Sequence, residues 1–206
     1  DHINFNKNVL YNTNAQKFKS EELSTSGLVF YWGIDCVIPQ LGLHNILFNE
    51  EYQQEFETIF DEKSNFKTPT IYIHVSSTVN KSDAPKGGMN LFIMINTSAY
   101  DSPTDAYKAQ MKQFVIAKIK AATGIDLTLH IKVENNWDNA EIEAKTGSTL
   151  GALYGAASNS LNSTLKRQGN RDKNNPNLYY CGGTVHPGGG IPLVTRSAKI
   201  VTDIIA

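Results

Sequence analysis

The sequence predicts an α+β fold, in which helices cover a β-sheet, because two hydrophobic periods recur along the chain. In short segments, aliphatic residues stand at every second position, which is the period of a strand. In longer segments, apolar residues repeat with the period of a helix. The connections between them are short and their faces are amphipathic, which favours a mixed sheet covered by helices. The chain has 206 residues, 40% hydrophobic and 19% charged, so it is large enough to bury a core.

The first strand is expected over residues 28–34, whose β-branched and aromatic side chains are apolar on both faces. A polar run at residues 24–26 precedes it, and the two-sided apolar pattern is typical of a buried strand. Residues 45–48 form a shorter strand candidate. Asn49 then caps a helix expected over residues 50–61, which carries acids in its first turn and an apolar stripe on one side.

Two more strands are expected on either side of the turn-rich residues 82–88. Aliphatic residues stand at every second position in residues 71–75 and again in residues 91–95. In each segment, one of the positions between them is aromatic. This alternation indicates that a sheet assembles from them.

The clearest helix is expected between Ser102 and Gly124. It begins at a capping box with proline in the first helical position, residues 102–105, and its apolar residues repeat at helical spacing until Gly124. Residues 129–134 then alternate apolar and polar side chains, as in a strand that has one face exposed to solvent.

The segment after this strand leads to a distinct tail. Asp138 and Glu141 form another capping box, so the preceding Trp137 is expected to be a packing residue rather than a platform on which a ligand stacks. The polar residues 166–176 are typical of a loop or linker. They separate the body of the chain from its last residues.

Charge and cysteine content exclude several classes of protein and site. With a formal net charge of -1 and a pI near 6.6, the chain has no positive electrostatic field that would attract nucleic acid. Cys36 and Cys181 form no CxxC pair, and no histidines fall at metal-ligand spacing, so neither a disulfide framework nor a metal site is predicted. A reducing compartment is expected. No apolar run approaches the roughly 20 residues that span a bilayer, and the start lacks the layout of a signal peptide.

The tail, residues 177–205, is rich in glycine. Residues 178–181 predict a short apolar strand, and Gly182 and Gly183 at its end let another backbone or a ligand approach closely. A His-Pro pair and a run of glycines follow, and a proline then opens a helix with one apolar face. These residues are His186, Pro187, Gly188, Gly189, Gly190, Ile191 and Pro192.

This order of strand, turn and helix presents unpaired backbone amides and the positive end of a helix dipole to whatever lies above the turn. Such a place favours negative charge. Consecutive glycines alone are more typical of a tight turn that packs a helix on a sheet. The flanking residues favour the ligand-binding interpretation.

Those flanking residues resemble a known family. NLYYCGGTVHPGGGIP, followed by SAKIVTDII, is similar to the C-terminal signature of the phytoene desaturase family, flavoproteins that desaturate carotenoids. The segments STSGLVFYWGI, DAPKGG and GALYG match the family's pattern in the same order. The resemblance covers most of the chain from about Ser24 onward, and it is closest to the hydroxycarotenoid 3,4-desaturase branch.

The resemblance implies a division of the chain into two parts. Residues 1–165 would be a portion of the substrate domain, and residues 166–206 would supply the last strand and helix of an FAD-binding, Rossmann-like domain. The GxGxxG unit that holds the FAD pyrophosphate is absent, because residues 188–193 lack its last glycine. The chain also opens at Asp1 without methionine, as a piece of a longer protein would. The missing N-terminal half is therefore an expected partner, and the isolated chain is expected to be inactive.

By the same resemblance, Gly182 and Gly183 would approach the phosphate or ribityl chain of FAD. Residues 189–192 would line the flavin ring, with the amide of Ile191 near its carbonyl edge, and His186 and Pro187 would contact the cofactor. A reduced flavin carries negative charge on its pyrimidine end, which the helix dipole would stabilise by about 0.3–1 kcal/mol.

The segment GALYG contains the candidate substrate-binding residues Gly151, Tyr154 and Gly155. Its small residues would let a long polyene or the flavin ring lie against the backbone, and close packing between elements explains them equally well. Conjugation of the substrate stabilises a developing cation, so no acid or base is required and no catalytic residue is assigned.

The family's reaction transfers a hydride from the polyene to the flavin, in carotenoid biosynthesis. A carotenoid taken from a membrane implies a cytoplasmic protein that lies at the membrane periphery. Two alternatives remain: a non-catalytic isoprenoid-binding module of the same fold, and a relative of the flavin amine oxidases. The His-Pro-Gly turn, where an acid would otherwise stand, weighs against amine oxidation.

Overall fold

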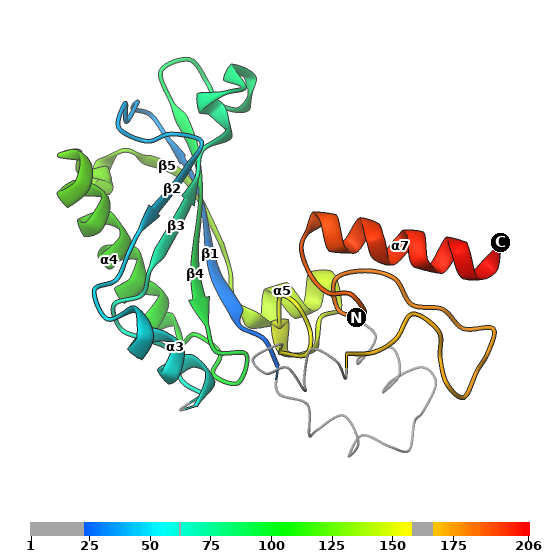
Figure 1. Ribbon diagram of the computed structural model, residues 1–206. Helices are drawn as coiled ribbons and strands as arrows, with labels where there is room; N and C mark the ends of the chain where they lie inside the picture. Colours follow the sequence, from blue (N-terminus) through cyan, green and yellow to red (C-terminus); the bar gives the residue numbers. More distant parts are fainter. Residues whose placement is uncertain (1–22, 62, 158–166) are drawn as a thin grey trace. The chain divides into compact units, whose positions relative to one another are not determined.

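The computed structural model describes residues 23–61, 63–157 and 167–206. They form two compact bodies, which are described separately. The sheet body is Ser26–Glu141, and the tail body joins residues 23–25 to Ile142–Ala206. Figure 1 shows the elements of both bodies along the chain. The start of the chain, including Asp1, lies outside the described residues.

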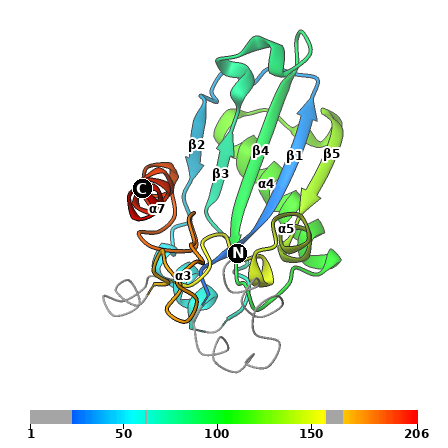
Figure 2. The same cartoon turned by 90° about the vertical axis from the view of Figure 1, so that its right-hand side faces the viewer.

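The sheet body is built on one open sheet of five strands in the order β2-β3-β4-β1-β5 (Figure 2). Every pairing is antiparallel, so the expectation of a mixed sheet is wrong. Side chains alternate with a period of two in parallel and antiparallel strands alike, so the sequence pattern did not specify the direction of the strands. The strands are β1 (Ser26–Ile34), β2 (His44–Leu47), β3 (Ile71–His74), β4 (Met89–Thr97) and β5 (Ile131–Trp137).

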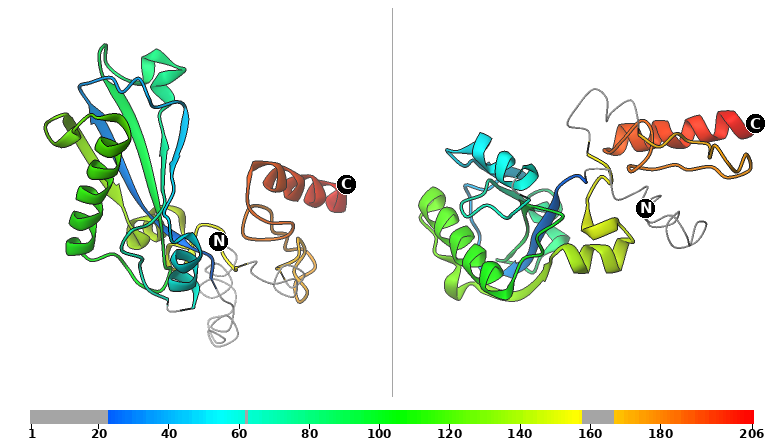
Figure 3. Two further views of the ribbon diagram at one scale, coloured as in Figure 1. Left: turned by 60° about the vertical axis from the view of Figure 1, so that its left-hand side comes forward. Right: turned by 90° about the horizontal axis from the view of Figure 1, so that it is seen from below.

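Two helices, α3 (Tyr52–Phe60) and α4 (Asp105–Thr123), cover one face of this sheet (Figure 1, Figure 3). Alternate strand residues pack against them, including Phe30, Trp32 and Ile93, which are almost fully buried. The predicted α+β class is confirmed, and the periodic patterns placed these elements correctly. The outer strand β5 differs from its prediction, because most of its residues are exposed on both faces.

The ends of α4 are set by local chemistry. Thr104, rather than Ser102, caps the helix, because its Oγ1 accepts a hydrogen bond from the amide of Tyr107 at 3.2 Å. Gly124 ends it in the left-handed conformation with φ 78°. The next residues form the short helix η4 (Leu127–Leu129), so β5 begins after Leu129.

The predicted cap at Asp138 is confirmed. Its Oδ1 accepts hydrogen bonds from the amides of Ala140 and Glu141 at the start of α5 (Asn139–Thr146). Its Oδ2 lies 2.7 Å from Nζ of Lys108 on α4. Burial alone would raise the pKa of Asp138, but the lysine and the two amides together hold that pKa below its ordinary value.

We expect Asp138→Ala to lower the free energy of unfolding by about 2 kcal/mol at pH 7, because it removes a helix cap and the nearer of the two carboxylates that pair with Lys108. A carboxyl with a lowered pKa stabilises the fold above its unfolded pKa, and that contribution disappears as the pH falls through the folded pKa. The difference between wild type and variant should therefore shrink in acid below about pH 4. Urea unfolding at several pH values measures it. Asp105→Ala is the control, because Asp105 also pairs with Lys108, at 3.3 Å, but is fully exposed and is not a helix cap; an equal loss in both variants would contradict the prediction.

The tail body contains the short helix η5 (Thr149–Gly151) and the long helix α7 (Ile191–Ile205), which begins with proline as predicted. The strand expected at residues 178–181 does not form. Only an isolated bridge between Arg171 and Tyr179 is present. The backbone of Gly182, with φ 127°, turns out of the strand conformation.

Within the described residues, no helix combines the length and the apolar composition needed to cross a bilayer.

Candidate functional site

The glycine-rich turn of the tail body, residues 182–190, is held in place by a buried polar network. Nδ2 of Asn170 lies within hydrogen-bond distance of the carbonyl oxygen of His186 at 2.9 Å and of Oγ of Ser197 at 2.9 Å. Ser197 lies on α7, is fully buried, and accepts a hydrogen bond from the amide of Gly182 at 3.2 Å. Asn170 also donates to the carbonyl oxygen of Tyr180. The network therefore fixes the start and the middle of the turn against the final helix.

The turn needs its glycines where the backbone has positive φ. Gly182, Gly188 and Gly190 have φ values of 127°, 136° and 95°, which other residues rarely adopt. The peptide bond between His186 and Pro187 is cis. A Cβ atom added at Gly182 or Gly190 would meet nothing within 4 Å, so the turn has open space beside it.

The start of α7 offers donors for an electron-rich group. Gly190 is its N-cap residue, and within the described residues no side chain caps the first amides of α7. Ile191, the first residue of the helix, is 83% exposed. An anionic or electron-rich group fits beside these amides and the positive end of the helix dipole.

The structure brings the GALYG segment against this turn, within the tail body. A Cβ atom on Gly189 would lie 2.3 Å from Cδ1 of Tyr154. A Cβ atom on Gly155 would lie 3.0 Å from Cβ of Thr184. Gly151 is buried at the end of η5 with φ 68°. The residues predicted for the cofactor and for the substrate thus share one cluster, and close packing explains Gly155 in particular.

Arg167 joins the two segments, and the sequence did not indicate it. Its Nη1 donates to the carbonyl oxygens of Tyr154 at 3.2 Å and of Gly183 at 2.8 Å. Its Nη2 donates to the carbonyl oxygen of Ala156 at 3.0 Å. Residues 166–176 were expected to be a loop or linker, and the described part is a loop, but Arg167 and Asn170 bind the tail turn directly.

The sheet body carries a second feature, which we call the aromatic row. On the face opposite the core, one aromatic ring from each strand contacts the ring on the next strand. The centroid distances are 6.1 Å, 6.3 Å, 5.5 Å and 5.2 Å in order along the row. The row consists of His44, Tyr72, Phe92, Tyr31 and Trp137.

The aromatic row is a largely apolar surface, in which three of the four ring contacts are edge-to-face. The rings are half-buried or exposed, whereas the alternate residues of the same strands lie in the core. Both helices that lie wholly within the sheet body, α3 and α4, are on the other face (Figure 1). Burial raises the pKa of Tyr31. At one end of the row, Nδ1 of His44 lies 2.7 Å from the Tyr72 hydroxyl.

The aromatic row could not be predicted from the sequence, because alternation along each strand does not show which residues of neighbouring strands lie side by side. The available signal was the aromatic side chains at strand positions that are usually polar, such as Phe92 between two aliphatic residues. Trp137, expected only to pack, is the last ring of the row.

Comparison with known proteins found several similar chains. The sequence is 47% identical over 191 residues to a 1-hydroxycarotenoid 3,4-desaturase of Flavobacterium sp. (strain P99-3). It is 31% identical over 194 residues to a 4,4'-diapolycopene oxygenase of Methylomonas sp, and 33% identical over 187 residues to a 4,4'-diaponeurosporene oxygenase of Staphylococcus aureus (strain MSSA476). No family model matches the chain.

These matches cover 92%, 92% and 89% of this chain. In turn, the chain spans only 39%, 39% and 37% of the length of those relatives. The glycine-rich tail turn and the sheet with its aromatic row thus both lie in a chain that matches less than half of each relative.

Proposed function

Because this chain belongs to the family of carotenoid desaturases and oxygenases, as a C-terminal portion of such proteins, we propose that the protein containing it is an FAD-dependent desaturase of carotenoids. The observation that carries this proposal is the 47% identity to a hydroxycarotenoid 3,4-desaturase over almost the whole chain. The remaining part of the protein would supply the dinucleotide-binding unit. We place the reaction in carotenoid biosynthesis, on a long polyene.

The tail turn supports a role in holding the flavin end of FAD. Bound FAD would supply the hydride acceptor, which no side chain of this chain can be. The first amides of α7 lack a side-chain cap and would stabilise negative charge on the ring. The open space beside Gly182 and Gly190 leaves room for a flat group. Arg167 and Asn170 would act as positioning residues, because they hold the turn in shape.

The aromatic row supports binding of a long, flat and apolar substrate. A polyene has no polar groups along its conjugated chain, so it is recognised by apolar contact and by ring faces rather than by hydrogen bonds. The rings extend across all five strands, which matches an extended molecule better than a compact one. Rings that pack against the substrate would also exclude water from it.

Two measurements test the activity. The complete protein, purified after expression in a carotenoid-producing host, should show visible flavin absorbance, and the host's pigment should lose two hydrogen atoms per new double bond. A pigment that gains oxygen would instead indicate the activity named for the oxygenase relatives. A colourless protein that leaves every pigment unchanged would contradict the proposal.

The role of the aromatic row is tested by Phe92→Ala. Loss of one ring contact of about 1 kcal/mol should raise the KM for the polyene about five-fold while the flavin content of the complete protein stays unchanged. Phe48→Ala is the matched control, because Phe48 is exposed on the same body and lies outside the row. Equal KM values for the two variants would remove the row from substrate binding.

A further inference from the structure

We propose that His44 and His74, which we call the histidine pair, select polyenes that carry a hydroxyl group at one end. The two residues lie on β2 and β3, at the edge of the sheet where the aromatic row begins. The inference rests on the proposed function, because it requires that the polyene binds along the row. The end of a polyene bound there would lie beside both imidazole rings.

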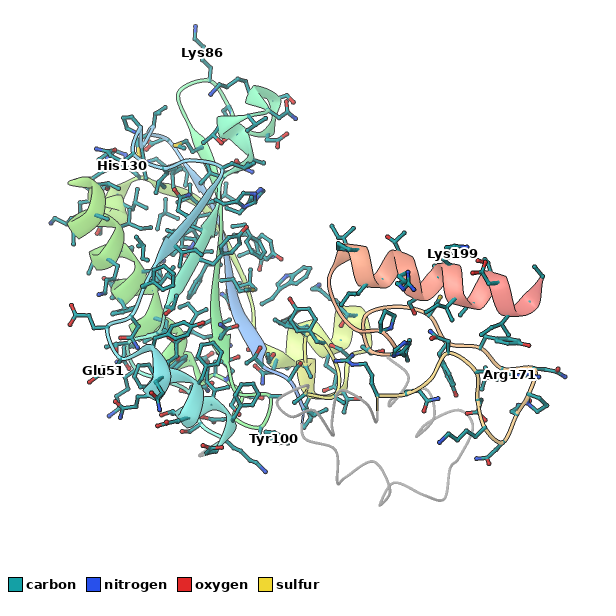
Figure 4. The ribbon with its side chains drawn as sticks, in the orientation of Figure 1. Glu51, Lys86, Tyr100, His130, Arg171 and Lys199 are labelled. Atoms are coloured by element: carbon teal, nitrogen blue, oxygen red, sulfur yellow. The ribbon has the colours of Figure 1, made fainter. Side chains whose placement is uncertain are left out.

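The members of the histidine pair are direct neighbours across two strands. His44 is opposite His74 in the register of β2 and β3, and their ring centroids are 5.1 Å apart. His74 is in turn opposite Phe92 of the aromatic row. Figure 4 shows side chains projecting from the strands on the face that α3 and α4 leave uncovered. Because directly opposed residues share a face, both imidazole rings lie on the same face as the row.

The hydrogen-bonding capacity of the histidine pair is only partly used. Nδ1 of His44 lies 2.7 Å from the hydroxyl of Tyr72. Among the described residues, Nε2 of His44 and both ring nitrogens of His74 have no hydrogen-bond partner. A neutral imidazole has one donor and one acceptor nitrogen. The pair can therefore offer both a donor and an acceptor to a ligand.

Two polar side chains elsewhere on the same face are occupied within the chain. Asn90 on β4 accepts from the amide of Ser77 at 3.0 Å and donates to Oγ of Ser76 at 2.8 Å. Asn135 on β5 accepts from the amide of Asn136 at 2.8 Å. The histidine pair differs from them, because its nitrogens are left for a group from outside the chain.

Binding of a polyene makes these nitrogens a source of selectivity. A polyene packed along the row displaces water from the histidine pair. An end made only of hydrocarbon would leave a nitrogen without any partner, which lowers affinity about tenfold. A hydroxyl group both donates and accepts, so it can bond to both kinds of nitrogen. A carbonyl oxygen only accepts, and the acceptor nitrogen would stay unpaired.

Tyr72 is a positioning residue for this selection. Its hydroxyl bonds to Nδ1 of His44, and its ring stacks on the imidazole with an interplanar angle of 21°. A hydrogen bond at one ring nitrogen of a histidine sets the state of the other nitrogen. Nε2 of His44 is thereby kept available for the polyene.

Binding of matched polyenes to the complete protein, in detergent micelles, tests the proposal. The probes are one linear polyene hydrocarbon, the same polyene with a hydroxyl group at one end, and the same polyene with a carbonyl group there. Quenching of tryptophan fluorescence gives each dissociation constant, because Trp137 lies in the row. We expect the hydroxylated polyene to bind about tenfold more tightly than the hydrocarbon. A carbonyl derivative that binds as tightly as the hydroxylated polyene would overturn the choice of a hydroxyl group.

Two variants remove the ring nitrogens and keep a ring of similar size. In His44→Phe and in His74→Phe, the hydroxylated polyene should bind about tenfold more weakly, whereas the hydrocarbon should bind equally well or better. The preference for the hydroxyl group should therefore disappear. Tyr72→Phe should reduce the preference only in part, because both imidazole rings remain. A merely structural role would weaken the binding of both polyenes alike.

Matched controls alter polar groups elsewhere on the same face. Tyr31→Phe deletes the same phenolic hydroxyl from the middle of the row, and Asn135→Leu removes the amide at the β5 end. Both should keep the preference of about tenfold, and circular dichroism checks that each variant folds.

Equal binding of the hydroxylated polyene and the hydrocarbon to the wild type, or a preference that survives in both histidine variants, overturns the selection. Absence of binding of any polyene would overturn the role of the aromatic row as well. Neither turnover nor flavin content is measured. A protein that binds the hydroxylated polyene preferentially but does not desaturate it would therefore contradict the proposed activity alone.

Discussion

Replacing Arg167 with alanine is expected to leave the complete protein largely without flavin. The guanidinium group donates to carbonyl oxygens of Tyr154, Ala156 and Gly183. Hydrogen bonds from a charged donor contribute about 1.5–3 kcal/mol each, although not additively. We therefore expect a loss of about 3 kcal/mol from the contact between the GALYG segment and the tail turn, and at least a tenfold loss of flavin affinity.

The measurement is the ratio of flavin to protein absorbance after dialysis, together with the midpoint of thermal unfolding. Arg167→Lys should be intermediate, because one ammonium group cannot reach the three carbonyl oxygens in the fork geometry of a guanidinium. Arg196→Ala is the control, since Arg196 is exposed on α7 and forms no ion pair with any described residue. Retention of flavin by Arg167→Ala would show that the hydrogen bonds of Arg167 do not position the tail turn for the cofactor.

The sheet body was predictable where its elements repeat a hydrophobic period. The strand at residues 26–34 and the helix at 105–123 bury a full set of apolar side chains. The spacing of these apolar residues in the sequence predicts that burial. The orientation of the strands was not predictable in the same way. Periodicity does not distinguish an antiparallel pair from a parallel one, and the sheet proved to be antiparallel throughout.

The tail body was harder to predict, because polar contacts over long sequence separations hold it together. Arg167 and Asn170 lie in a stretch whose composition is that of a loop, and their partners are mainly backbone carbonyl oxygens, which carry no sequence signal. Tyr154 illustrates the same point. The sequence suggested that it binds substrate, but not that its ring packs on Gly189.

Gly189→Ala is expected to have the second large effect, because the added methyl group has no room. Its Cβ atom would lie 2.3 Å, 2.9 Å and 3.2 Å from Cδ1, Cε1 and Cγ of Tyr154. The backbone of Tyr154 is held on both sides, by Oγ of Ser24 at its amide and by Arg167 at its carbonyl oxygen. The ring or the turn must therefore move, at a cost of about 1–3 kcal/mol, and flavin binding to the complete protein should weaken.

Gly169→Ala separates this clash from a general effect of replacing glycine. Gly169 lies in the same body, has no positive φ, and a Cβ atom there would meet nothing within 4 Å. It should therefore be neutral or slightly stabilising. Gly189→Ala combined with Tyr154→Ala should recover most of the lost stability and flavin, because the obstructing ring is gone. A double variant no better than the sum of its parts would place the cause elsewhere, since only residues in contact couple in such a cycle.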